Sequence, residues 1–115
     1  MNAPFLAKKL KSFIQSGMSY ATLSHDLILN APEKTNLSLS YLNAAISRFS
    51  SAEAFYYAQY DSLQDDCADK LFFLFDKFAN ELFNNVASNH SHQWTDIEYE
   101  CLNDLYLSSA FSSDE

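Results

Sequence analysis

The longest periodic pattern in the chain covers residues 50–87, which read SSAEAFYYAQYDSLQDDCADKLFFLFDKFANELFNNVA. Apolar side chains recur there every three or four residues, at Tyr56, Tyr60, Leu63, Cys67, Leu71, Leu74, Phe78 and Leu82. Because an α-helix has about 3.6 residues per turn, this spacing places them on one helix face. It predicts a long central helix from about residue 52 to Ala87. Ser62 followed by Asp65 is a second helix-start signal, so the pattern fits either one helix or two.

Three shorter helical patterns precede this segment, over residues 2–16, 19–30 and 38–49. Gly17 is expected to end the first helix, because glycine readily adopts the left-handed conformation found after helix C-termini. Ser19 is a favourable N-cap for the second. The N-terminal half is therefore predicted to be a unit of three short helices.

Paired capping residues mark two further helix starts. Ser50 with Glu53 would start the central helix, and Thr95 with Glu98 would start a last helix that buries Leu102. We therefore expect an all-α single domain of five or six helices, with the N-terminal three-helix unit packed on a long central helix.

The composition excludes several other classes. The 115 residues include one Gly and two Pro, too few for the turns of a β-sandwich, a barrel or a doubly wound α/β sheet. Phosphate-binding loops need several glycines, so nucleotide-binding motifs of that kind are excluded. No run of about 18 apolar residues is present, so we expect no membrane span. Cys67 and Cys101 are expected to be buried free thiols of a cytoplasmic protein.

Charge is distributed unevenly along the chain. Residues 1–50 hold five basic and two acidic residues, a net charge of +3, whereas residues 51–115 carry a net charge of −11. We interpret these as a basic unit (1–50) and an acidic unit (51–115) of one compact domain, with surfaces for different partners. The alternative is an acidic surface that serves solubility only.

Two segments of the basic half resemble a known family. Residues 13–24 (FIQSGMSYATLS) and 38–48 (SLSYLNAAISR) are similar to the opening and the recognition helix of helix-turn-helix DNA-binding domains of plasmid and phage regulators, over about residues 3–50. The resemblance implies duplex DNA as the partner, with base edges and phosphates contacted by separate residues. The implied DNA-binding residues are Lys8, Lys9, Lys11, Ser38, Ser40, Asn43, Ser47 and Arg48.

The acidic half suggests a different partner. At 100° per residue, Asp61, Asp65, Asp69 and Asp76 fall within about 80° of one another on a helix. Like charges at this spacing destabilise a helix slightly, so helix stability does not explain them. Glu98, Glu100 and Asp104 add carboxylates from the last helix. Such rows resemble the charge pattern of a nucleic-acid strand and would fit a basic protein groove.

Aromatic residues raise the question of a further surface. Leu71 to Phe75 are five consecutive apolar residues, which no single helix face can bury. Some of them must therefore meet either the N-terminal half or a second copy of the chain in a homodimer.

Residues typical of catalysis or metal binding are few. His90 and His92, near Asp96 and Cys101, lack the spacing of a zinc site. No nucleophile-base arrangement can be identified, so we expect no metal, no cofactor and no enzymatic activity.

Two functions remain. The favoured one is a small helix-turn-helix-type DNA-binding accessory or regulatory protein of a mobile element, whose acidic helices bind protein. The alternative is an acidic nucleic-acid mimic that inhibits a DNA- or RNA-binding complex, in the manner of phage inhibitors of host defence.

Overall fold

The computed structural model describes residues 3–88 and 92–113, and this part of the chain is helical with no strand. The predicted all-α single domain is confirmed. The α-helices are α1 (Ala3–Asn30), α2 (Thr35–Ala58), α3 (Tyr60–Leu63), α4 (Asp66–Ser88) and α5 (Gln93–Ser108). Short 3-10 helices follow α1 (η1, Pro32–Lys34) and α5 (η2, Ala110–Ser112).

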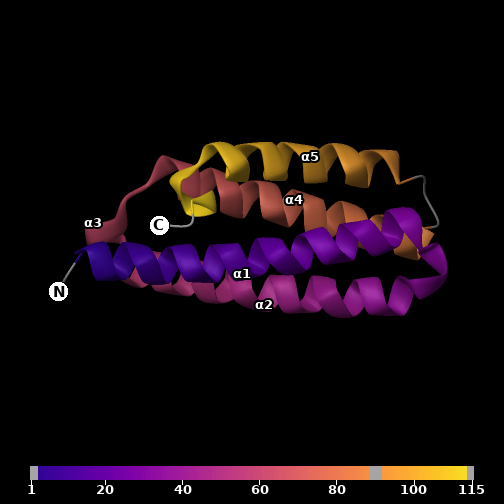
Figure 1. Cartoon of the computed structure of the whole chain (residues 1–115), viewed down its shortest axis with the longest axis horizontal. Coiled ribbons are helices and arrows are strands. Elements are labelled where there is room, and N and C mark those ends of the chain that lie inside the picture. Colours follow the sequence, from indigo (N-terminus) through magenta and orange to yellow (C-terminus); the bar gives the residue numbers. More distant parts are fainter. Residues whose placement is uncertain (1–2, 89–91, 114–115) are drawn as a thin grey trace.

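The four long helices form an antiparallel bundle of 47 × 23 × 21 Å (Figure 1). α1 and α2 make one hairpin, α4 and α5 make the other, and α3 joins the two at the end where α1 begins. After α5, the C-terminal segment packs against α1. There the Gln15 side-chain amide donates hydrogen bonds to the carbonyls of Phe111 and Ser113, at 2.9 and 3.0 Å. None of the described helices is long and apolar enough to cross a membrane.

The predicted helix break at Gly17 is wrong, because α1 continues through it to Asn30. Gly17 is buried against α2, and a Cβ atom at this position would lie 2.7 Å from Cδ2 of Phe49. The missing side chain therefore serves close helix packing and not a left-handed turn. Ser19 does not cap a new helix either, since its hydroxyl donates to the Gln15 carbonyl, one turn earlier.

Two buried serines connect α1 and α2 close to the turn between the two helices. The Ser24 hydroxyl donates to the Ser38 carbonyl, the Ser38 hydroxyl donates to the Ser24 carbonyl, and both distances are 2.8 Å. Each hydroxyl thus exchanges the hydrogen bond to water that it loses on burial for one to a carbonyl of the partner helix. Two polar side chains can therefore lie between the helices at little cost in free energy.

The predicted helix start at Ser50 is also wrong. α2 runs from Thr35 to Ala58, and its buried face continues without interruption from Ala45 and Phe49 to Ala52 and Tyr56. A boundary at residue 50 therefore falls inside a helix. The N-terminal half contains one long helix and most of a second, and not three short ones.

The residues after α2 answer whether the central segment is one helix or two: it is divided. α2 ends at Ala58, and α4 begins at Asp66 after the short α3. The buried Tyr56 holds the corner, because its hydroxyl accepts from the Asp65 backbone N–H at 2.8 Å and donates to the Asp65 carbonyl at 3.0 Å. Burial is the main reason that the pKa of Tyr56 rises to about 12.

α4 supplies most of the second half of the core. Of the five consecutive apolar residues, Leu71, Phe72 and Phe75 are buried, whereas Phe73 is 63% exposed. Phe75 stacks on Phe49 of α2 with ring centroids 4.0 Å apart. The N-terminal half thus covers part of this aromatic segment, which is the first of the two alternatives predicted.

Candidate interaction surface

The residues predicted to contact DNA do not gather at one end of the bundle. Lys9 lies over the Phe55 ring near the end of α2, with its Nζ 5.4 Å from the ring centroid. Ser40 and Asn43 lie in the first half of α2, so Asn43 is about 18 Å from Phe55 along the helix axis. Lys8 and Lys11 belong to the same end as Lys9.

Ser38 cannot read DNA bases in this structure. It is fully buried, and its hydroxyl is bound to Ser24 of α1. Ser40, Asn43 and Ser47 are exposed and lie at i, i+3 and i+7 of α2. Arg48 is exposed at an adjoining position, with its guanidinium carbon 6.0 Å from the centroid of the Tyr20 ring.

The predicted row of four aspartates is divided by the corner between α3 and α4. Asp61 lies on α3, while Asp65 precedes α4 and caps it, accepting hydrogen bonds from the N–H groups of Cys67 at 2.8 Å and Ala68 at 3.1 Å. The cap satisfies two otherwise unpaired N–H groups at the start of α4. Asp65 therefore has a structural role.

Asp69 and Asp76 share one edge of α4, the edge that faces α2. The Tyr57 hydroxyl of α2 donates to Asp69 at 3.2 Å, and the Tyr56 hydroxyl lies 3.3 Å from the other carboxylate oxygen. Asp76 lies two turns further along, beside Glu53 of α2. Together with Asp65, these carboxylates follow the junction of the two hairpins.

The acidic residues of α5 face elsewhere. Glu98 lies 3.8 Å from the ammonium group of Lys77, a distance that gives an ion pair without a hydrogen bond. Glu100 and Asp104 are exposed. The seven predicted acidic residues thus occupy more than one face.

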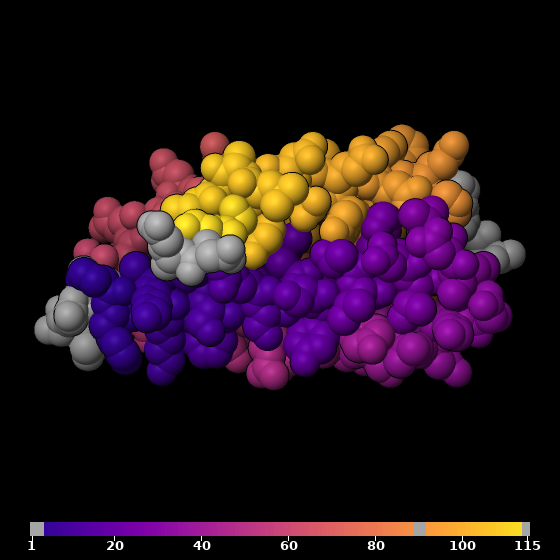
Figure 2. All heavy atoms as spheres, viewed as in Figure 1, coloured from indigo at the N-terminus to yellow at the C-terminus, as the bar shows by residue number. Residues whose placement is uncertain are grey.

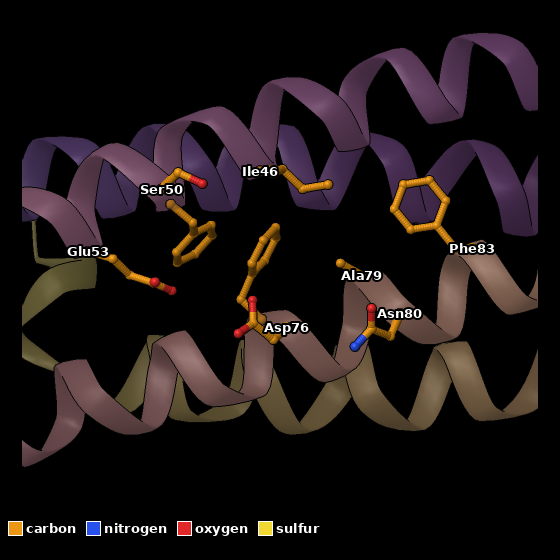
Figure 3. A pocket seen from close by; sticks show the side chains of 9 residues that line it. Ile46, Ser50, Glu53, Asp76, Ala79, Asn80 and Phe83 are labelled. Atoms are coloured by element: carbon orange, nitrogen blue, oxygen red, sulfur yellow. The ribbon is translucent and has the colours of Figure 1, made fainter.

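A groove between α2 and α4 combines an apolar floor with an acidic rim. It encloses about 250 Å³ and is lined by residues of these two helices only. We call it the α2–α4 groove; its lining residues are Ile46, Phe49, Ser50, Glu53, Phe75, Asp76, Ala79, Asn80 and Phe83. Figure 3 shows the carboxylates of Glu53 and Asp76 directed into the same space from opposite helices.

The electrostatics of the groove are one-sided. Partial burial, and second the nearby charge of Asp76, raise the pKa of Glu53. Partial burial also raises the pKa of Asp76, although this residue is exposed overall. No Lys or Arg lines the groove, and neither carboxylate forms a hydrogen bond or ion pair with another described residue. The folded chain therefore brings together two negative charges that it does not itself neutralise.

Sequence reasoning missed Glu53 as a site residue, because it assigned the side chain to a capping box. The available signal was its spacing. Ile46, Ser50 and Glu53 recur at helical steps along one edge of α2, beside the buried face that carries Phe49. That edge becomes a groove wall only when α4 packs beside it.

A second polar cluster joins the end of α1 to the start of α5. His25 is buried, and its Nε2 lies 2.7 Å from Oδ1 of Asp96, while Nδ1 of His92 lies 2.7 Å from Oδ2. Burial alone would raise the pKa of Asp96, but the hydrogen bonds from both histidines outweigh it and lower that pKa. The His25 ring stacks on Tyr99 at 4.2 Å. Figure 2 shows this end of α1 against the start of α5.

No group of three metal-ligating side chains exists among residues 3–88 and 92–113. His90, part of the cluster considered above, lies outside the described residues. Cys67 and Cys101 are free; Cys67 is half-buried, which raises its pKa, but Cys101 is exposed, contrary to the prediction that both are buried.

Comparisons with protein-family models, curated proteins and solved structures found no match. The functional argument therefore depends on the chemistry of the surfaces themselves.

Proposed function

We propose that this chain is a non-enzymatic acidic interaction protein that occupies the basic, nucleic-acid-binding surface of a partner and thereby blocks it. The observation that carries the proposal is the α2–α4 groove, where two helices hold facing carboxylates without a cation of their own. A partner with basic side chains would supply the missing charge.

The distribution of charge supports the same partner. The chain has a net charge of −8. Asp61 is exposed on α3, and Glu100 and Asp104 are exposed on α5. Long-range attraction accelerates encounter with a positively charged groove, and the same field repels nucleic acid. A protein of this charge is thus better suited to compete with DNA than to bind it.

Competition with DNA provides the test. The 115-residue chain is immobilised and incubated with a bacterial cell lysate. Bound proteins are then eluted either with duplex DNA or with an uncharged polymer. We expect duplex DNA to release proteins that bind nucleic acid, since both ligands need the same basic surface. If the bound proteins are not released by duplex DNA and are eluted only by raised salt, the proposed competition with nucleic acid is contradicted.

DNA binding by the chain itself remains the second candidate. Exposure of Ser40, Asn43, Ser47 and Arg48 along α2 favours it. It requires that the full chain shift a duplex in an electrophoretic mobility assay at about 50 mM salt, and that Arg48→Ala abolish the shift. If the wild-type chain gives no shift, this candidate is excluded.

A further inference from the structure

The α2–α4 groove has the size of a site for one side chain. Its volume of about 250 Å³ is below the roughly 300–1,000 Å³ of pockets for drug-sized ligands. It is also open along the bundle surface between two helices, so a side chain projecting from another protein can enter it (Figure 3).

The floor and the rim of the groove favour different parts of a bound side chain. Phe49, Phe75 and Ala79 are buried at the bottom of the groove, and Phe83, which is 40% exposed, forms one end. An apolar floor of this kind can cover a hydrocarbon stem. Glu53 and Asp76 flank it from opposite helices, so the end of the occupant must be positive and must offer donors in two directions.

We infer that the α2–α4 groove receives an arginine side chain of the basic partner, with the aliphatic stem on the phenylalanine floor and the guanidinium between Glu53 and Asp76. Arginine fits better than lysine because its planar group presents donors on two edges and stacks favourably on aromatic rings. This inference rests on the proposed function and adds to it the site and the side chain that are recognised.

Nona-arginine is a suitable probe, because it needs no knowledge of the partner. The 115-residue chain is titrated into fluorescently labelled nona-arginine at about 150 mM salt, where long-range attraction is largely screened. We expect the double variant Glu53→Gln/Asp76→Asn to bind roughly tenfold more weakly than wild type.

A matched control separates the groove from general charge attraction. Glu100→Gln/Asp104→Asn removes the same charge from positions of α5 outside the groove, and we expect its affinity to fall by roughly threefold or less. Equal losses in the two double variants would overturn the inference. Nona-lysine is expected to bind more weakly than nona-arginine to the wild-type chain; equal affinities would overturn the assignment to arginine.

A third variant tests the groove without altering charge. Asn80 is exposed at the rim, so Asn80→Trp should fill the space while the fold, followed by circular dichroism, stays intact. We expect it to weaken nona-arginine binding as much as the double variant does. Unchanged binding would overturn the inference.

The two proposals fail in distinguishable ways. If Glu53→Gln/Asp76→Asn still captures proteins that DNA releases, the proposed function stands and the groove is not its arginine site. If the wild-type chain captures no such proteins but binds nona-arginine through the groove, the proposed function is wrong and the groove still recognises arginine.

Discussion

Gly17 shows how a single residue sets the spacing of a hairpin. A glycine inside a helix costs about 1 kcal/mol relative to alanine, yet Gly17 lies in the middle of the 28 residues of α1. The compensation is the close approach of Phe49, whose ring occupies the space where a Cβ would be. Phe49 in turn stacks on Phe75 of α4, so both hairpins depend on this contact.

Gly17→Ala should therefore destabilise the protein, although alanine favours helix. The new methyl group would lie 2.7 and 2.8 Å from two ring carbons of Phe49, which is 1% exposed and held by its stack on Phe75. Overpacking costs about 1–3 kcal/mol, more than the helix gain. We expect the free energy of unfolding in urea to fall by about 1–2 kcal/mol.

Ser12→Ala is the control for helix propensity, because Ser12 is exposed on the same helix. It should leave the free energy of unfolding unchanged or slightly raised. A Gly17→Ala protein as stable as the Ser12→Ala protein would show that Phe49 moves aside freely.

The negative charge of Asp96 stabilises the contact between α1 and α5. Its carboxylate accepts from His25 and His92, and its pKa is lowered below the usual 3.8. A lowered pKa means that the charged form stabilises the folded state above about pH 4, and that this contribution disappears as pH falls through the folded pKa. Asp96→Asn should lower the free energy of unfolding by about 1–2 kcal/mol at pH 7.

Urea unfolding at pH 7 and near pH 3 measures this contribution. The difference between wild type and Asp96→Asn should shrink at the lower pH, while the exposed Glu100→Gln should be nearly neutral at both. A difference that grows on acidification would contradict the role assigned to the Asp96 carboxylate.

At the scale of elements, local patterns predicted the helical class but not the helix ends. The 3.6-residue period and the single glycine were sufficient for the all-α fold. The capping signals at Gly17 and at Ser50 with Glu53 were misleading, because contacts with residues far along the chain kept both segments helical. Of the two alternatives left open for the central segment, the divided one is confirmed, but Ser62 lies inside α3 and Asp65 supplies the cap of α4.

The candidate site was harder to predict for the same reason. Periodicity located Asp76 on a helix edge, but its facing partner Glu53 lies on another helix, 23 positions earlier. The His25 bond to Asp96 likewise joins residues 71 positions apart. Which polar residues meet depends on how α1, α2, α4 and α5 pack, and one helical pattern carries no information about that.

The α2–α4 groove makes a prediction for the pair of helices that build it. Because burial raises the pKa values of Glu53 and Asp76, their charged forms are less favourable in the folded than in the unfolded chain. Glu53→Gln/Asp76→Asn should therefore raise the melting temperature at pH 7, by only about 1 °C because solvent screens both groups. The advantage should diminish as pH falls through the raised pKa values, since the wild-type groups then become neutral.

Thermal melts of the two proteins at pH 7 and pH 4 test this. A lower melting temperature of the double variant at pH 7 would show that the carboxylates stabilise the fold, and would remove the reason to regard them as a binding site. The expected combination is greater stability with weaker nona-arginine binding, which is typical of residues retained for function.

At the scale of the whole molecule, shape and charge act together. A net charge of −8 is spread over a bundle only 23 × 21 Å in cross-section. At about 0.01 M salt the screening length is about 30 Å, longer than this width, so charges on opposite sides repel one another. At about 0.15 M salt it falls to about 8 Å, and only neighbouring charges still interact.

The melting temperature should accordingly rise with sodium chloride between about 0.01 and 0.15 M, because screening relieves repulsion that is stronger in the compact state than in the unfolded chain. The triple variant Asp61→Asn/Glu100→Gln/Asp104→Asn changes exposed residues only, so it should keep the fold and show a smaller rise. If instead the melting temperature fell as salt increased, attractive pairs such as Lys77 with Glu98 would outweigh the repulsion between like charges. Repulsion among the acidic residues would then not destabilise the fold. A partner that neutralises this surface would then gain nothing from relieving repulsion. The change of melting temperature with salt concentration therefore bears directly on how strongly a basic partner is favoured.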